Sequence, residues 1–197
     1  SEVNYASYAD PDLDIVLDDA RNYIATTDEE FSVIVTDVTN LKYKRNPYLY
    51  TREYFEIMRG ALSEDGVAAA WLPVGGLSFN DLRTLIATFD SVFPHTTAWY
   101  FTQFPTHFII LVGTPEPTLV NLRELNEKIA EVETDLRSLN VDNVYELASM
   151  LLLGERDIDS LVDGAAIHTD NRPILEYSDM DLYNVVDVAP NDRKGAF

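Results

Sequence analysis

The sequence predicts an α/β sandwich with a mixed sheet, and three observations support this fold class. Short apolar segments alternate with amphipathic segments of helical spacing, which is the order of repeated βα units. The apolar segments are continuous rather than alternating, which is typical of parallel strands covered on both faces. Finally, segments 96–102 and 108–113 are joined by residues 103–107 alone, and so short a connection allows only an antiparallel hairpin.

The chain begins with two predicted strands separated by a helix. The β-branched segment Leu13–Leu17 (LDIVL) is the first strand, and a helix follows from Ala20 to about Thr26. The apolar run Phe31–Thr36 (FSVIVT) is the second strand and ends at Asp37. A polar loop from Val38 to Tyr48 comes next.

A third predicted strand lies between the second and third predicted helices in the sequence. Thr51 is a predicted N-cap, and the helix Thr51–Leu62 has apolar residues at helical spacing. Glu64–Gly66 is a predicted turn, and Val67–Leu72 (VAAAWL) is a third buried strand. The following helix runs to about Ser91, and either Ser78 or Asn80 can cap it.

The strands Thr96–Thr102 and Phe108–Gly113 form the hairpin that makes the sheet mixed. Beyond Pro117 we expect an amphipathic helix from about Leu119 to Leu139, a second helix over Asn143–Leu153 and then an acidic turn. We therefore divide the chain into a Rossmann-like part, residues 1–115, and a helical extension, residues 116–197, that packs on the same domain.

The charge is strongly negative, because 34 acidic and 14 basic residues leave a formal net charge of −20. Such a chain repels phosphate backbones and anionic membrane surfaces, which excludes non-specific nucleic-acid binding and direct membrane contact, and it attracts cations such as polyamines. Adaptation to high salt and ordinary acidity explain this charge equally well. Cysteine is absent, and the three histidines are too far apart for metal-ligand spacing, so we expect no metal.

Acidic side chains follow the predicted parallel strands at the edge where open α/β sheets bind ligands. Asp18 and Asp19 follow the first strand, and Asp37 and Asn40 follow the second. A carboxylate at this edge can bind an amine or take its proton. The alternative is that each aspartate caps the next helix. No G-x-G-x-x-G, P-loop or nucleophile elbow occurs, and His168 is interpreted as a buried loop histidine with its hydrogen bonds satisfied.

Five stretches of the chain carry a resemblance to a known family. They are DPDLDIVLDDARNYI (Asp10–Ile24), FSVIVTDVTN (Phe31–Asn40), NPYLYTREYFEIMRGALSEDGVAAAWLP (Asn46–Pro73), DLRTLIATFDSVFPHTTAW (Asp81–Trp99) and HTDNRPILEYS (His168–Ser178). In order and spacing they resemble the spermidine synthase-like aminopropyltransferases, most closely the bacterial and archaeal subgroup that is often fused to membrane segments.

The resemblance implies a class I methyltransferase-like Rossmann fold with strand order 3-2-1-4-5-7-6. It also implies transfer of an aminopropyl group from decarboxylated S-adenosylmethionine to putrescine or a similar amine. Asp19 then contacts the adenine, with Ala20 beside it, and Asp37 orients and deprotonates the attacking amine. Asn40 and Tyr50 lie on the substrate side. The resemblance implies a cytoplasmic location, with the longer parent protein tethered to the membrane through its N-terminal region.

Three departures from the family pattern limit this expectation. Asn40 stands where the family has a second acid, and Ala70 stands where it often has glutamine. The family's first two strands, which carry the glycine-rich loop and the ribose-binding acid, have no counterpart in these 197 residues. We therefore expect no catalysis by this chain alone. A non-catalytic Rossmann-like module and an S-adenosylmethionine-dependent methyltransferase-like protein remain the alternatives.

The missing strands also affect the sheet. Leu13–Leu17 has no family neighbour in this chain, so it pairs beside Phe31–Thr36, exchanges into a second copy, or packs loosely. Phe31–Thr36 exposes an edge that belongs in the centre of the family's sheet, and unpaired edges favour self-association. We therefore expect a homodimer.

Overall fold

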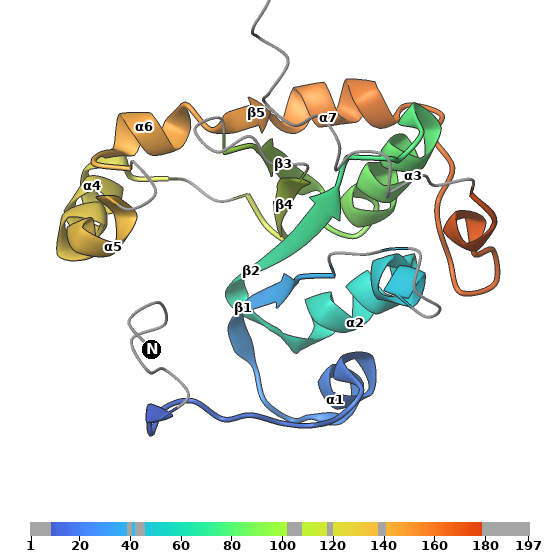
Figure 1. Ribbon diagram of the computed structural model, residues 1–197, viewed down its shortest axis with the longest axis horizontal. Coiled ribbons are helices and arrows are strands. Elements are labelled where there is room, and N and C mark those ends of the chain that lie inside the picture. The colour runs from blue at the N-terminus through green and yellow to red at the C-terminus, as the bar shows by residue number, and fades with distance from the viewer. Residues whose placement is uncertain are drawn as a thin grey trace, which may run out of the picture.

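The structure is a computed structural model that describes residues 9–38, 41, 46–101, 108–117, 120–137 and 141–178. Its centre is a five-stranded sheet with the order β1-β2-β4-β3-β5 (Figure 1). β1 (Phe31–Thr36) runs parallel to β2 (Leu62–Pro73), and the remaining pairs, which involve β4 (Phe108–Thr114), β3 (His95–Trp99) and β5 (Leu151–Leu153), are antiparallel. The predicted mixed sheet and its hairpin are confirmed.

Three helices lie on one side of the sheet, to its right in Figure 1: α1 (Ala20–Thr26), α2 (Arg52–Ala61) and α3 (Phe79–Asp90). α1 packs against α2, and α2 and α3 pack on the central strands. The largest fully buried side chains of this layer include Tyr50, Phe55, Met58, Leu72, Leu85, Ile86, Phe89, Phe93 and Leu111. The main core therefore lies between these helices and one face of the sheet.

Each of these helices begins with a local side-chain cap. Asp19 accepts a hydrogen bond from Asn22 N at 3.0 Å, and Thr51 accepts one from Tyr54 N at 3.3 Å. Ser78 Oγ accepts one from Asp81 N at 3.1 Å, so Ser78 rather than Asn80 is the cap of α3. The predicted starts of the first three helices are confirmed.

The opposite face of β1 corrects the prediction that these strands are covered on both faces. Val33 and Val35, which alternate with the buried Ile34 and Thr36, are each 59% exposed. A continuous apolar run predicts a strand buried on both faces, but α1, α2 and α3 all lie on one side of the sheet. β1 also forms the end of the sheet in the described part of the chain, so its outer edge is unpaired there.

The segment Leu13–Leu17 is not a strand, which corrects the first predicted element. Ile15 and Leu17 are 65% and 96% exposed, and β1 pairs with β2 instead of with this segment. Of the three expected outcomes, pairing beside Phe31–Thr36 is wrong, whereas loose packing and exchange into a second copy both stay predictions. The physical reason is that an apolar, β-branched sequence becomes a strand only where a neighbouring backbone accepts its hydrogen bonds.

The predicted turn at Glu64–Gly66 is also wrong, because β2 begins directly after α2. The pairing with β1 is irregular here: Phe31 lies opposite Leu62, whereas Val33 lies opposite Val67. A Cβ atom on Gly66 would lie 2.9 Å from both Leu62 Cβ and Ser63 O. The glycine therefore serves this close approach within the irregular strand rather than a turn.

The C-terminal part differs most from the prediction. The first expected helix is divided into α4 (Leu122–Glu131) and α5 (Glu133–Arg137). The second ends early as α6 (Val144–Ala148), because Leu151–Leu153 forms β5 and pairs with β3. Where a turn was expected, α7 (Glu155–Val162) packs on α3 and β3. Two 3₁₀ helices, η2 (Asn46–Tyr50) and η3 (Ile174–Tyr177), complete the described elements.

The division of the chain at residue 115 into a Rossmann-like part and a helical extension stays a prediction.

Among the described residues, no helix combines the length and the apolar character that crossing a bilayer requires.

Candidate functional site

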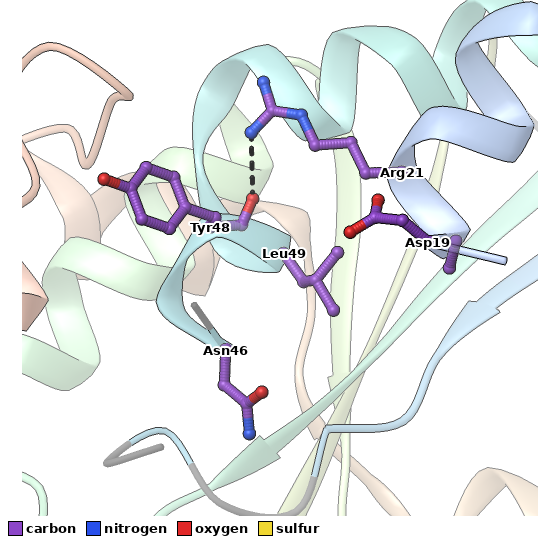
Figure 2. Close-up of a pocket in the computed structure, with 6 residues that line it drawn as sticks. Asp19, Arg21, Asn46, Tyr48 and Leu49 are labelled. Atoms are coloured by element: carbon purple, nitrogen blue, oxygen red, sulfur yellow. Dashed lines mark hydrogen bonds between the residues drawn. The ribbon is translucent and has the colours of Figure 1, made fainter. Parts of the chain in front are cut away.

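A hollow of about 500 Å³ opens between the start of α1 and η2 (Figure 2). Its lining residues are Asp19, Ala20, Arg21, Asn46, Tyr48 and Leu49. Pro47 and Tyr50 of η2 are buried and anchor this short helix to the core, so their neighbours Asn46, Tyr48 and Leu49 are left to form the wall of the hollow. The structure thus brings the predicted residues Asp19 and Ala20 to a cavity.

Asp19 has a structural role that the sequence offered as the alternative. Its side chain caps α1 by accepting from Asn22 N at 3.0 Å, and its own N–H donates to Asp18 Oδ1 at 2.7 Å. The side chain is exposed and lies beside the hollow (Figure 2). Capping occupies part of the carboxylate, and the adenine contact proposed for Asp19 stays a prediction.

Arg21 connects the two walls of the hollow. Its Nη1 donates to Tyr48 O at 3.2 Å (Figure 2) and to Thr51 Oγ1 at 3.4 Å. The same guanidinium forms a bidentate ion pair with Asp170, with Nη1–Oδ1 and Nη2–Oδ2 distances of 2.9 and 2.5 Å. These hydrogen bonds lower the pKa of the Asp170 carboxyl.

Sequence reasoning missed both Arg21 and Asp170 as site residues. One local signal pointed to Arg21: a cation in the first turn of a helix is opposed by the helix dipole and therefore requires a specific partner. No local signal identified that partner, because Asp170 is 149 positions away. Asn46 and Tyr48 lie within a stretch that carried the family resemblance, but their spacing alone did not reveal the hollow.

Asp37 and Tyr50 lie at the other side of the candidate site, where β1 ends. Asp37 is exposed directly after β1, whereas Tyr50 is fully buried. The Tyr50 hydroxyl is 2.5 Å from Trp71 O and 3.3 Å from Val38 O. Burial raises the pKa of Tyr50, and the nearby Asp37 charge contributes in the same direction.

Tyr50 therefore joins the ends of β1 and β2 through backbone carbonyls. The single hydroxyl proton of Tyr50 is donated to these carbonyls. A substrate-side role for Tyr50 would therefore consist of holding the two strand ends in place. That role stays a prediction, as does the role of Asp37 as the base. Asn40 lies outside the described residues.

Tyr54 links the hollow to the end of β1. Its hydroxyl lies 3.0 Å from Thr36 Oγ1, one residue before Asp37. Burial raises the pKa of Tyr54, the Thr36 hydrogen bond and the Arg21 charge lower it, and the Asp19 charge raises it. The Tyr54 hydroxyl therefore lies at the end of β1, and the charges of Arg21 and Asp19 both act on it.

His168 is buried beneath η2. Its Nε2 lies 3.0 Å from Pro47 O, and because a carbonyl only accepts, Nε2 carries the proton. Among the described residues, the buried Nδ1 has no hydrogen-bond partner, so only one ring nitrogen of the predicted buried histidine is satisfied there. Burial lowers the pKa of His168, which favours the neutral ring. The described residues contain no cluster of three potential metal ligands.

Comparison with known proteins gives a consistent result. A family model described as the spermine/spermidine synthase domain matches residues 2–114. Polyamine aminopropyltransferase 1 of Pseudomonas aeruginosa is 29% identical over 97 residues, which are 49% of this chain and 32% of that protein. The polyamine aminopropyltransferase of Saccharolobus islandicus is 26% identical over 133 residues, 66% of this chain and 44% of that protein. The chain therefore spans less than half the length of these relatives.

A solved structure of spermidine synthase in complex with the transition state analogue AdoDATO has the same fold. It superposes with a TM-score of 0.54 at 18% identity, over 80% of this chain and 51% of the other. At this identity the likeness shows the fold, which is the methyltransferase-like α/β fold that the sequence predicted. The observed order β1-β2-β4-β3 corresponds to 4-5-7-6 in the expected strand order.

Proposed function

The chain belongs to the spermine/spermidine synthase domain family, and from this premise we propose that it forms the amine-side part of an aminopropyltransferase. The family resemblance predicted from the sequence is confirmed. One observation carries the proposal within that family: Asp37 is exposed directly after β1, beside the buried Tyr50, in the segment that the family model matches. A carboxylate at the carboxyl end of a parallel strand lies where open α/β sheets bind their ligands.

In the proposed reaction, Asp37 accepts a proton from a substrate ammonium group and holds the resulting amine for attack. The amine nitrogen forms a bond to the aminopropyl carbon next to the sulfonium of decarboxylated S-adenosylmethionine. The carbon–sulfur bond breaks, and its electron pair stays on sulfur, which leaves 5′-methylthioadenosine. The acceptor we propose is putrescine or a similar small amine, which the negative charge of the chain also attracts.

We assign the adenosyl side to the hollow beside α1. Asp19 and Ala20 are at the position where we propose the adenine contact, and Arg21, Tyr48 and Leu49 complete the wall. The spermidine synthase of similar fold was solved in complex with the transition state analogue AdoDATO. This complex supports an adenosyl ligand for the present chain. The 197 residues contain no glycine-rich loop, so we propose that they do not complete a turnover alone.

The test is Asp37→Asn in the full-length protein, assayed with decarboxylated S-adenosylmethionine and putrescine. Loss of the base is expected to lower kcat by about 100-fold or more, since general-base contributions have at least that size. Asp65→Asn is the control, because it removes the same charge from an exposed position in β2.

Retention of kcat within a few-fold in Asp37→Asn would remove Asp37 from the role of base. Calorimetric titration of the same protein with each substrate is the complementary measurement. Absence of heat with both, well above millimolar concentrations, would contradict an aminopropyltransferase and favour a non-catalytic module.

A further inference from the structure

Hydrogen bonds of its backbone hold the polar segment His168–Asp170 against α2 and α3. His168 N donates to Thr88 Oγ1 of α3 at 2.9 Å, and Arg52 N of α2 donates to His168 O at 3.0 Å. Asp170 N donates to Glu53 Oε2 of α2 at 3.0 Å. The segment therefore has a defined position at the start of α2, although it comes more than 100 residues later in the chain.

From this position the Asp170 side chain reaches α1. Both of its carboxylate oxygens accept from Arg21, at 2.9 and 2.5 Å, in the planar geometry that favours arginine over lysine. The two side chains are 22% and 32% exposed. Because the contact is bidentate and only partly exposed, the ion pair fixes the orientation of the Arg21 guanidinium as well as contributing to stability.

The geometry that the ion pair maintains is the width of the hollow. Arg21 belongs to α1, which forms one wall, and its Nη1 also donates to Tyr48 O of η2, which forms the other wall (Figure 2). Below the same wall, His168 Nε2 donates to Pro47 O at 3.0 Å. One segment, His168–Asp170, thus contacts η2 directly and contacts α1 through Arg21.

We propose that Asp170 is a positioning residue that sets the shape of the adenosyl hollow by orienting Arg21 across it. Without Asp170, Arg21 keeps its charge but loses the bidentate acceptor that directs Nη1 at Tyr48 O. α1 and η2 then move independently, and the hollow no longer has one preferred width. This inference rests on the proposed function only for the identity of the ligand.

The first test measures the affinity of the full-length protein for 5′-methylthioadenosine by calorimetry. We expect Asp170→Asn to weaken binding about tenfold, since small displacements of positioning groups have effects of this size or larger. Asp170→Glu keeps a bidentate carboxylate and is expected to restore binding to within about threefold of the wild type. In an Arg21→Gln background, Asp170→Asn is expected to add nothing further, because the two side chains act as one unit.

The matched control is Glu56→Gln, which also removes the charge of one carboxylate that pairs with an arginine in this region. Glu56 pairs with Arg52 at 3.6 Å on the exposed side of α2 and does not line the hollow. Glu56→Gln is expected to bind like the wild type. Equal affinities for Asp170→Asn and Glu56→Gln would overturn the proposal.

A second measurement separates this proposal from the proposed function. The measurement is amide hydrogen exchange without ligand. In the Asp170→Asn variant, the backbone amides of residues 20–26 and 46–50 are expected to exchange faster than in the Glu56→Gln variant. In the Asp170→Glu variant, the same amides are expected to exchange no faster than in Glu56→Gln. If the wild type fails to bind 5′-methylthioadenosine, the adenosyl assignment is wrong, and the exchange pattern alone decides the role of Asp170. Unchanged exchange in both segments would overturn that role.

Discussion

At the residue scale, the fold changes the acidity of one carboxyl group far from the candidate site. Asp90, the last residue of α3, is half-buried. Burial raises its pKa to about 6, the charges of Asp159 and Glu155 on α7 act in the same direction, and a hydrogen bond with Thr96 opposes them. His95 Nδ1 lies 3.5 Å from Glu155 Oε2, so this histidine contacts Glu155 rather than Asp90.

The raised pKa makes stability depend on pH in a predictable direction. The folded-state value of about 6 exceeds the ordinary value of 3.8, so the folded protein binds more protons than the unfolded chain between these pH values. The free energy of unfolding therefore falls as the pH rises from about 4 to about 6. We expect Asp90→Asn to be more stable than the wild type by about 1 kcal/mol at pH 8, after discounting for solvent screening, and equally stable near pH 3.

Urea unfolding at both pH values is the measurement, with Asp65→Asn as the control. Asp65 is exposed in β2, and its replacement removes the same charge. A stabilisation by Asp90→Asn that is the same at pH 3 and pH 8 would contradict the assignment of the raised pKa.

At the element scale, the contact between α3 and β4 depends on the absence of a side chain. A Cβ atom on Gly113 of β4 would lie 2.6 Å from both Phe89 Cε1 and Phe93 Cβ. The two aromatic rings are themselves 4.8 Å apart between centroids and are fully buried. The helix approaches the sheet this closely because position 113 is glycine.

Two glycine-to-alanine changes should therefore have opposite effects. Gly113→Ala is expected to lower the free energy of unfolding by about 2 kcal/mol, because the added methyl group overpacks the core. Gly60→Ala in α2 meets no atom within 4 Å, and it should raise the free energy of unfolding by about 0.5–1 kcal/mol through helix propensity. Urea unfolding of the two variants tests this, and a stabilised Gly113→Ala would show that α3 can withdraw from the sheet.

At the scale of the whole molecule, two features act in opposite directions on self-association. The outer edge of β1 is unpaired in the described part of the chain, and its Val33 and Val35 side chains are largely exposed. Such an edge favours pairing with a second copy. The net charge of −20 opposes this association until salt screens it.

We therefore expect the chain to form homodimers along β1 at about 2 M KCl, where charges are screened within a few ångströms, and to dissociate at low salt. Val35→Lys places a charge on this edge strand and should leave the chain monomeric at both salt concentrations. The measurement is light scattering coupled to size-exclusion chromatography. Leu122→Lys, an equivalent change at an exposed position in α4, should still dimerise, and a monomeric wild type at high salt would refute the dimer.

Much of the fold was predictable because its signals are local. Asp19, Thr51 and Ser78 stand immediately before the helices that they cap. The hairpin of β3 and β4 followed from a connection too short for any other arrangement. The candidate site was predictable only in part: Asp19 and Ala20 line the hollow, whereas its other wall, η2, comes from a loop that showed no helical periodicity.

Composition and element order were thus sufficient for the fold class and the strong negative charge, and the resemblance of five sequence stretches was sufficient for the family. Tertiary structure decided which apolar segments became strands: Leu151–Leu153 pairs with β3, whereas the more strand-like Leu13–Leu17 pairs with no strand in the described part of this chain. It also joined Arg21 to Asp170 across 149 positions. The reason is the same in both cases, because a strand and an ion pair each need a partner, and the chain brings distant partners together only when it folds.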